Sequence, residues 1–450
     1  MPDVIKIKKG LNIQLKGKAE KIFIKAPRSE TYAVKPPDFH GITPKMMVNV
    51  DEQVKAGSPL FFDKANPEVL FTSPVSGKIV AINRGERRRI LEVVIKADET
   101  FEHESFGKID LDKATREEIC SYLLKSGAWP FILQRPYAII ANPHDKPKAI
   151  FISGFDSAPL APDYDFLLKE SKEEFQAGIN VLSKLTEGTV HLNLNGEFPV
   201  APVFSGLKNA RVNLFKGPHP AGTVGVQMNK LDPVNKGEVV WYVNPQDVAM
   251  IGRLMGKGMY DASKIVAFTG SDAETPRYYK TVAGASIKSI TEGNVTIGDT
   301  RYISGNVLTG TKVNVDGYLG FYDSQITVIP EGNYYEFFGW AGPGIKKFSM
   351  SKSFFSWLFP GKEYKIDTNL HGGRRAFVMS DQYTKVCPMD IYPVQLIKAI
   401  LIEDIDLMEK LGIYEVAEED LALCEFVCTS KIEVQSILRK GLDMMRKEMS

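Results

Sequence analysis

The chain has 450 residues, of which 44% are apolar and 25% charged, and its net charge is +1. The length predicts about three domains, and the composition is ordinary for a globular protein. A net charge this small provides no overall field to attract polyanions, so we expect no nucleic-acid partner. The four cysteines are too few and too unevenly spaced for a secreted disulfide framework.

The N-terminus and the hydropathy pattern give the expected location. The opening MPDVIKIKKG lacks the apolar core of a signal peptide. No apolar run reaches the roughly 20 residues needed to cross a bilayer. We therefore expect a cytoplasmic protein, whose work at a membrane would depend on a partner or a surface patch.

Residues 1–105 are expected to form a β domain, because short alternating strands are separated by Gly and Pro. The run Val54–Leu60, followed by Ser73–Ile79, resembles a biotinyl/lipoyl-type β-sandwich. Carrier domains of that type present a modified lysine at a tight hairpin tip. The corresponding tip here, residues 63–67, lacks the usual flanking residues. We therefore interpret the sandwich as structural, with Lys64 simply solvated.

Residues 106–260 alternate between strand and helix, which predicts a Rossmann-like α/β domain. The apolar run 149–152 predicts a buried strand, and its polar loop contains Gly154, Asp156 and Ser157. Such loops form ligand sites at the carboxyl ends of strands. Further strands are expected over 189–193, 210–214 and 239–243, and a helix over Leu168–Leu185. Helix starts are expected at two capping boxes, Thr115 to Glu118 and Ser171 to Glu174, and at Asn244 followed by Pro245.

Beyond the α/β domain the pattern changes twice. Residues 261–335 show further strands, a turn through Pro276 and a short helix, which predicts a small separate module. Residues 336–375 are irregular and aromatic and are expected to be a connecting segment. Residues 376–450 are expected to form a helical C-terminal domain.

Three cysteines lie in the C-terminal domain. Cys387-Pro388 and the segment Leu423–Cys428 each resemble the end of a C-x2-C-x2-C-x3-C-P ferredoxin run. A [4Fe–4S] cluster needs four thiolates, whereas the first pseudo-site supplies one and the second two. We therefore expect a ferredoxin-like domain that has lost its iron–sulfur clusters. Unrelated buried cysteines are the alternative, chiefly for Cys387.

Several segments together resemble a known family along nearly the whole chain. They are Lys35–Gly41, Phe71–Lys78, Gly85–Arg88, Lys216–Gly222, Asn244–Val248, Ile303–Gly305, Tyr318–Gly320, Phe338–Trp340 and Glu418–Cys428. The chain is similar to the NqrA subunit of the bacterial Na+-translocating NADH:quinone reductases. That family is related to the large electron-input subunit of the Rnf complex and, more distantly, to the flavin-bearing subunit of respiratory complex I.

The resemblance implies a place in a redox-driven sodium pump. The chain would be a peripheral member of a six-subunit complex, on the cytoplasmic face of the bacterial inner membrane and attached through partner subunits. The complex passes electrons from NADH to quinone and exports Na+. The resemblance also implies that Lys264 to Glu331 is a soluble-ligand-binding β-grasp (SLBB-like) module.

The resemblance and the residues together predict that no cofactor is tightly bound. A flavin phosphate is usually held by glycine-rich backbone amides, and the resemblance implies that a glycine-rich loop of the flavin-binding relatives occupies the region that matches Gly127–Pro136. Here that segment is bulky and aromatic, and the second loop, Gly217–Thr223, contains two prolines. We therefore expect no FMN. His219 and His40 are interpreted as hydrogen-bonded loop residues in preference to metal ligands. The six histidines share no metal-ligand spacing, so we expect no metal.

Two loops, 32–40 and 129–137, are candidates for quinone contacts, which need aromatic walls and hydrogen-bond donors. The candidate residues are Tyr32, Phe39, His40, Phe131, Arg135 and Tyr137. The alternative is that both loops are rigid and only pack the domains together. A third loop, with Phe354, Phe355, Trp357, Leu358 and Phe359, is a candidate docking patch for a membrane subunit if it is exposed, and core if it is folded inward.

Three functional hypotheses follow. The favoured one is a cofactor-free subunit of the reductase that helps to bind or admit quinone and docks on the membrane subunits. No residue need catalyse bond chemistry. The alternatives are a flavin or iron–sulfur electron carrier in its own right, and a pure scaffold without affinity for quinone.

Overall fold

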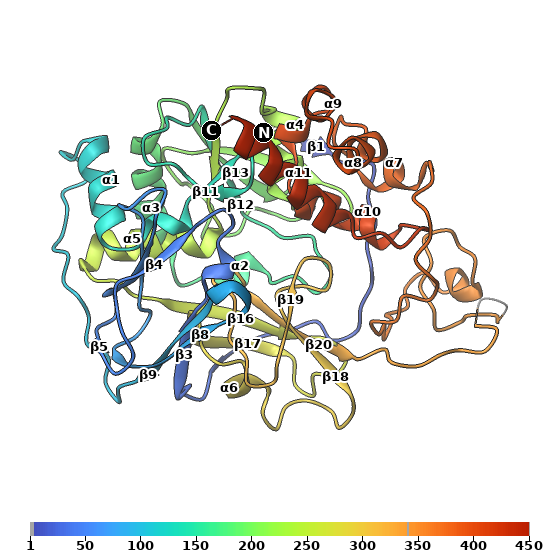
Figure 1. Cartoon of the computed structure of the whole chain (residues 1–450), viewed down its shortest axis with the longest axis horizontal. Helices are drawn as coiled ribbons and strands as arrows, with labels where there is room; N and C mark the ends of the chain where they lie inside the picture. Colours follow the sequence, from blue (N-terminus) through green and yellow to red (C-terminus); the bar gives the residue numbers. More distant parts are fainter. Residues whose placement is uncertain (1–3, 340–341, 450) are drawn as a thin grey trace.

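The computed structural model describes residues 4–339 and 342–449, and its strands form four sheets within those residues (Figure 1). The largest sheet joins strands from the first residues of the chain to strands of its middle third. Its order is β1 (Val4–Lys6), β14 (Arg211–Lys216), β13 (Thr189–Asn195), β12 (Ala149–Ser153), β15 (Val240–Tyr242), β10 (Leu133–Arg135), β11 (Ile139–Ile140). The first five strands are parallel, and β10 runs antiparallel to both of its neighbours, β15 and β11. We call it the central sheet.

Strand β12 is apolar on both faces because both faces are covered. Ile150 and Ile152 belong to the large core shared with α3 (Lys172–Leu185) and α5 (Pro245–Lys257). Ala149 and Phe151 pack on the opposite face with Val224 and Met228 of α4 (Val224–Leu231). A continuous apolar strand between two helical layers is typical of a parallel α/β sheet, so the expected strand and the expected α/β domain are confirmed.

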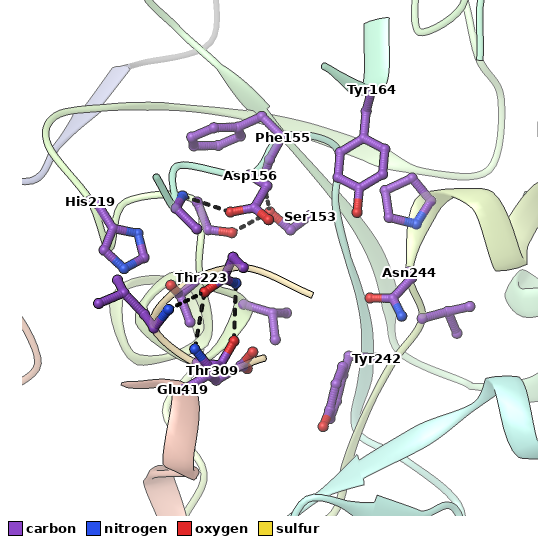
Figure 2. Close-up of a pocket in the computed structure, with 17 residues that line it drawn as sticks. Ser153, Phe155, Asp156, Tyr164, His219, Thr223, Tyr242, Asn244, Thr309 and Glu419 are labelled. Carbon is purple, nitrogen blue, oxygen red and sulfur yellow. Dashed lines mark hydrogen bonds between the residues drawn. The ribbon is translucent and has the colours of Figure 1, made fainter. Parts of the chain in front are cut away.

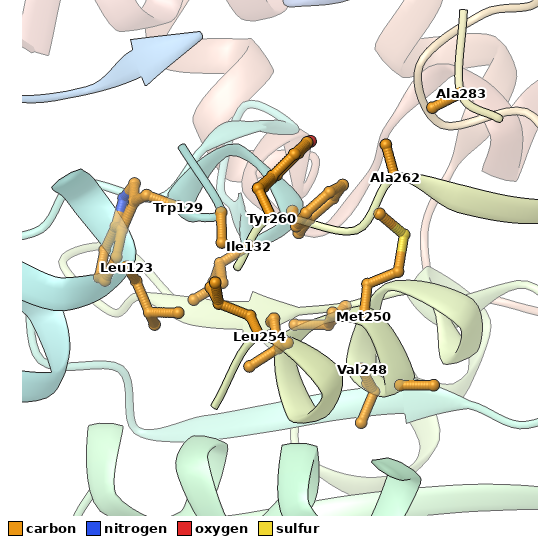
Figure 3. Close-up of a cluster of buried hydrophobic side chains, with 14 of the residues drawn as sticks. Leu123, Trp129, Ile132, Val248, Met250, Leu254, Tyr260, Ala262 and Ala283 are labelled. Carbon is orange, nitrogen blue, oxygen red and sulfur yellow. The ribbon is translucent and has the colours of Figure 1, made fainter. Parts of the chain in front are cut away.

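The helical layer over the first face is closely packed. Figure 3 shows side chains of α5, among them Met250 and Leu254, grouped with Leu123 of α1 (Arg116–Lys125) and with Trp129. The capping box expected at Thr115 is formed, with the Thr115 hydroxyl and the Glu118 carboxylate each accepting a backbone N–H.

Three expectations about helix starts were wrong in detail. The helix expected over Leu168–Leu185 begins only at Lys172, as α3, and a separate short helix, α2 (Tyr164–Leu167), ends just before Leu168. Ser171 makes no side-chain cap bond, because its backbone (φ −120°, ψ 29°) lies outside the extended region from which a cap side chain reaches the helix amides. Asn244 precedes Pro245 at the start of α5 as expected, but its side chain bonds the Asp247 carboxylate and no backbone amide.

The N-terminal residues form two smaller sheets and also contribute to distant ones. One small sheet has the order β3 (Thr31–Val34), β9 (Ile90–Ala97), β8 (Gly77–Arg84), β5 (Gln53–Val54), and the other β4 (Pro44–Met46), β6 (Pro59–Asp63), β7 (Leu70–Thr72). Lys64, in the β6–β7 turn, is exposed. By contrast, β1 pairs with β14 of the central sheet and β2 (Glu20–Lys25) pairs with β17 of a third module.

The third module has a mixed six-stranded sheet and a short helix, α6 (Lys288–Thr291), packed on it through Ile287 and Ile290. Its strands are, in order, β19 (Thr311–Val313), β18 (Thr300–Ser304), β20 (Gln325–Pro330), β16 (Ser263–Thr269), β17 (Arg277–Val282) and β2. The expected strands, the turn at Pro276 and the short helix are all present.

The C-terminal region is helical, as expected, and follows a largely irregular stretch. Its helices are α7 (Gln382–Val386), α8 (Pro393–Leu401), α9 (Ile405–Lys410), α10 (Ala422–Phe426) and α11 (Val434–Met449), and two short 3-10 helices lie among them, η5 (Ile413–Glu415) and η6 (Glu418–Leu421). Helices α8 and α11 share a core with η5 and with Phe215 of β14.

Short 3-10 helices also occur earlier in the chain. They are η1 (Pro36–Asp38), η2 (Glu86–Arg88), η3 (Trp129–Phe131) and η4 (Phe355–Leu358).

The contact between α3 and α5 depends on two glycines. A Cβ on Gly178 would lie 2.0 Å from the Val248 carbonyl oxygen, and one on Gly252 would lie 1.8 Å from the Glu174 carbonyl oxygen. Both distances are far shorter than a van der Waals contact. The two backbones therefore approach more closely than any side chain at these positions permits.

The glycines of α5 give a matched test. Gly252→Ala is expected to destabilise the protein by about 1–3 kcal/mol, because the helices must separate to admit the methyl group. Gly256→Ala, in the same helix, meets nothing within 4 Å and is expected to stabilise it by about 0.5–1 kcal/mol through helix propensity. Urea midpoints followed by circular dichroism measure both, and equal effects of the two substitutions would contradict the close approach.

Candidate functional site

A cavity of about 120 Å³ lies at the carboxyl ends of β12 and β15. Strand β12 leads into the loop that contains Asp156, and β15 leads into the start of α5 at Asn244. Ligands of open α/β sheets bind outside the carboxyl ends of the strands. We call it the strand-end cavity, and the lining residues that matter below are Asp156, Tyr164, His219, Tyr242, Asn244 and Glu419, together with the segment 306–309 of the third module.

Two carboxyl groups line the strand-end cavity. The Asp156 carboxylate accepts a hydrogen bond from the Ala158 amide at 2.8 Å, and burial raises its pKa. Glu419 comes from η6 of the C-terminal region. Burial and the neighbouring Asp420 carboxylate raise the pKa of Glu419 to about 7, against the opposing effect of Arg135. The charge on the cavity wall therefore changes near neutral pH.

Two tyrosines face these acids across the cavity. Figure 2 shows open space between Asp156 and Thr309 on one side and Tyr164, Tyr242 and Asn244 on the other. Burial raises the pKa of both phenols, so both hydroxyls remain protonated at neutral pH. The wall therefore combines flat apolar rings with hydrogen-bonding groups.

The loop 217–223 closes against the loop that follows β12. The Gly222 amide donates to the Ser157 hydroxyl at 2.8 Å, which leaves the hydroxyl hydrogen for Nδ1 of His219 at 3.0 Å. A Cβ on Gly222 would lie 2.6 Å from the Ser157 nitrogen, so only glycine permits this approach. Burial lowers the pKa of His219 to about 4. The interpretation of His219 as a hydrogen-bonded loop residue is confirmed.

The lining does not suit a phosphate. None of the described residues that line the cavity is Lys or Arg. The Asp420 carboxylate of η6 lies against the first turn of α4, where a Cβ on Gly225 would be 2.3 Å from Oδ1 of Asp420, and Asp247 belongs to the first turn of α5. The protein's own carboxylates thus take the positions at which helix N-termini would favour an anion.

A second cavity, of about 230 Å³, lies between the N-terminal domain and the central sheet. His40 and Gly41 line one side and Tyr137 to Asn142 the other, and Arg446 and Met449 of α11 close the end. The Arg446 guanidinium donates to the Gly41 carbonyl at 2.9 Å. The two candidate quinone loops therefore meet at one place, which we call the loop cavity.

The six candidate quinone residues lie in three environments, which are the loop cavity, a buried ion pair and the hydrophobic core. His40 is about half exposed and burial lowers its pKa, while the Tyr137 ring packs against Tyr414. Arg135 is completely buried and pairs with Asp420 at 2.8 Å and Glu419 at 3.1 Å.

The other three candidates are core residues. Tyr32 packs edge-on against Phe101. Phe39 and Phe131 both contact the Phe321 ring of the third module, with centroid distances of 4.8 and 5.1 Å. Their part in binding quinone stays a prediction. Of the six, the loop cavity brings only His40 and Tyr137 together.

The candidate docking patch is exposed. Phe355, Trp357, Leu358 and Phe359 each expose at least half of their surface, and Phe354 is half-buried under Lys347. Sequence alone left open whether this loop was core or surface, and the structure places it at the surface. What covers it stays a prediction.

The four cysteines are buried and unpaired by disulfides. Cys387 and Cys424 are close enough to hydrogen-bond, and Cys424 also interacts with Cys428. Within residues 4–339 and 342–449 no group of three or more His, Cys, Asp or Glu side chains is arranged to hold a metal ion. Over the same residues, no helix has both the length and the apolar character to cross a bilayer.

Sequence reasoning singled out the loop after β12 and the loop 217–223, but not the other walls of the cavity that they share. Asp156 was found because it follows a buried parallel strand. Tyr164, Tyr242 and Glu419 were missed because they come from segments whose neighbourhood depends on the folded chain. The run Glu418 to Asp420 did carry a signal, since three consecutive acids in an apolar segment need partners.

The buried ion pair predicts a large stability effect. Arg135→Met is expected to cost about 3–5 kcal/mol, because it leaves the Asp420 carboxylate buried without its cation. The double variant Arg135→Met/Asp420→Leu is expected to recover part of this loss. Urea unfolding of both variants tests the idea, and a double variant less stable than Arg135→Met would contradict it.

Comparison with protein families matches three parts of the chain. Residues 5–98 match the NqrA N-terminal barrel-sandwich hybrid domain, residues 114–260 the NqrA second alpha/beta domain, and residues 265–315 the NQRA C-terminal domain, an SLBB domain. The architecture is therefore multidomain, with a barrel-sandwich domain, an α/β domain and an SLBB-like domain.

Solved structures and curated relatives also resemble the chain. A crystal structure of an NAD+-reducing [NiFe]-hydrogenase in the air-oxidized state aligns over 77% of this chain and 67% of its own, at 11% identity and a TM-score of 0.39, too low to support an argument. The A subunit of the Na(+)-translocating NADH-quinone reductase of Yersinia pestis bv. Antiqua (strain Angola) is 40% identical over 99% of this chain and 100% of its own length. The corresponding protein of Neisseria meningitidis serogroup A is 39% identical, again over 99% of this chain and 100% of its own. The chain belongs to the NqrA family, the A subunits of the Na(+)-translocating NADH-quinone reductases.

Proposed function

We propose that the chain is a cofactor-free, peripheral subunit of a Na+-translocating NADH:quinone reductase, that it binds or admits quinone at the loop cavity, and that it docks on a membrane subunit. The complex reduces quinone with electrons from NADH and exports Na+. The chain sits on the cytoplasmic face of the bacterial inner membrane, held there by its partners. The observation that carries the quinone role is the meeting of the loops 32–40 and 129–137 at one cavity.

The chemistry of the loop cavity suits a quinone ring. Ile42, Val69, Ile139 and Ile140 give it apolar walls, and Tyr137 adds an aromatic edge. The imidazole of His40 and the guanidinium of Arg446 can donate to carbonyl oxygens. A mainly apolar pocket with a few convergent donors is the usual form of a small-molecule site.

The absence of a resident cofactor is supported by the lining of the strand-end cavity. Its carboxylates oppose a flavin phosphate, and the C-terminal cysteines are too few for a cubane cluster. A flavin or iron–sulfur carrier is the competing function, and visible absorbance of the purified protein would reveal it. A pure scaffold is the other competitor, and it would show no saturable response to quinone.

Quinone binding should quench tryptophan fluorescence. Trp129 donates through Nε1 to the carbonyl of Ala141, a lining residue, at 2.7 Å, so its indole reports on the loop cavity. Titration with a short-chain ubiquinone is expected to give saturable quenching. His40→Ala is expected to weaken binding about three- to tenfold, since it removes one hydrogen bond.

The control is His144→Ala. His144 is exposed and pairs with Glu68 outside the lining, so its loss should leave the affinity unchanged. Hydrogen exchange should show protection of residues 39–42 and 137–142 by quinone. If quenching is not saturable, or if both histidine variants bind equally well, the quinone site lies elsewhere.

The docking role is supported by the exposed aromatic loop. Four large apolar side chains gather at 355–359, with Lys352 and Lys362 flanking them. Contiguous exposed apolar surface with a polar rim marks an interaction site. The proposed occupant is a membrane subunit of the complex.

Removal of the two central rings should weaken assembly. Phe355→Ser/Trp357→Ser is expected to reduce retention of this chain by the membrane subunits at least about tenfold, because buried interface aromatics each contribute about 2 kcal/mol or more. Co-purification with a tagged membrane subunit measures this. Phe198→Ser, another exposed aromatic position outside the patch, serves as the control. Undiminished retention of the double variant would rule the patch out as the contact.

A further inference from the structure

The strand-end cavity is built by three parts of the chain. The α/β domain supplies Asp156, Tyr164 and Tyr242, the third module supplies the loop 306–309, and the C-terminal region supplies Glu419 (Figure 2). None of these residues belongs to the loop cavity, and the proposed quinone role does not use them. A hollow enclosed by three segments so distant in sequence is a candidate ligand site in its own right.

We propose that this cavity binds a small planar ring that carries N–H donors, of the amidine or aromatic amide class. The proposal rests on the size of the cavity, on its aromatic walls and on the sign of its charge. It is independent of quinone binding.

The size fits one ring. The cavity volume is about 120 Å³, of the same order as the roughly 150 Å³ cavity that holds benzene. A single ring is therefore the largest rigid group that the cavity takes in, and any substituent on the ring must extend toward its open side.

The aromatic walls favour a flat ligand. Tyr164 and Tyr242 face the hollow from the side opposite Asp156 (Figure 2). The Tyr242 ring already lies 5.7 Å from the Arg135 guanidinium, a flat cation with N–H donors. An amidine or amide in the cavity would offer the same chemistry to the same kind of ring.

The polar groups favour N–H donors over acceptors. Asp156 and Glu419 present carboxyl oxygens. Arg135 pairs with Glu419 at 3.1 Å from outside the lining, and no Lys or Arg among the described residues lines the cavity itself. The Asp420 carboxylate lies against the first turn of α4, and Asp247 belongs to the first turn of α5. An anionic ligand would therefore meet the carboxyl groups of Asp156 and Glu419, with no Lys or Arg of the lining to bind it directly.

Three isosteric probes separate the alternatives on the full-length chain. Benzamidine, benzamide and benzoate share a ring and differ in charge. Isothermal calorimetry at pH 8 is expected to rank them in that order, with benzamidine binding at least tenfold more tightly than benzoate. Asp156→Asn should weaken benzamidine at least about fivefold, because the amide keeps the bond to Ala158 but loses the charge.

The dependence on pH provides a second readout. Burial and Asp420 raise the pKa of Glu419 to about 7, and Arg135, Glu418 and Asp156 are the other charged groups that act on it. Glu419 gains its negative charge as the pH rises through this value. Benzamidine is therefore expected to bind more tightly at pH 8 than at pH 6, while benzamide should change less.

Substitutions at the rim locate the site. Thr309 is an exposed lining residue, and Thr309→Trp is expected to abolish benzamidine binding without unfolding the chain. Thr311→Trp, two residues further on and outside the lining, should leave binding intact. Benzoate binding as tight as that of benzamidine, no saturable binding of any probe, or benzamidine binding that neither Asp156→Asn nor Thr309→Trp changes would overturn the proposal.

Discussion

The buried guanidinium of Arg135 joins the central sheet to the C-terminal region. It stands at the end of β10, on the far side of the central sheet from β1, and its partners Asp420 and Glu419 lie 285 and 284 residues away in the C-terminal region. A buried cation without these carboxylates would carry a large desolvation cost. The C-terminal region must therefore dock for β10 to be accommodated. The same contact brings Glu419 to the strand-end cavity. Glu419 therefore both pairs with Arg135 and lines the cavity.

The loop cavity depends on the C-terminal region in a similar way. Arg446 of α11 bonds the Gly41 carbonyl, and Arg439 donates to the Tyr137 carbonyl at 2.8 Å while pairing with Glu418 at 3.1 Å. One helix thus fixes both candidate quinone loops. The two loops are held at a fixed separation by the last helix described in the chain, and a ligand between them would also contact that helix.

Local patterns predicted the elements well where the cause was local. Strand β12 follows from its apolar run, and α1 follows from a capping box whose two bonds both lie within four residues. The cap expected at Ser171 is absent because the backbone of Ser171 lies outside the extended region that a cap needs. The burial of Arg135 could not be read from 129–137, because the acids that make it possible are encoded far away. The same holds for Tyr242 and Glu419, whose shared cavity exists only after three segments have packed.

The pairing of β1 with β14 has a consequence for the order of events in synthesis. Val4 faces Leu214 across this parallel pair, so the strand Val4–Lys6 cannot pair with β14 until 210 further residues have been made. At translation rates of roughly 5–20 residues per second, that wait is on the order of 10 to 40 s. During it the strand Val4–Lys6 has an unpaired edge. The shortness of the strand and its lysine limit what such an edge can recruit, which suits a strand whose partner is encoded so far along the chain.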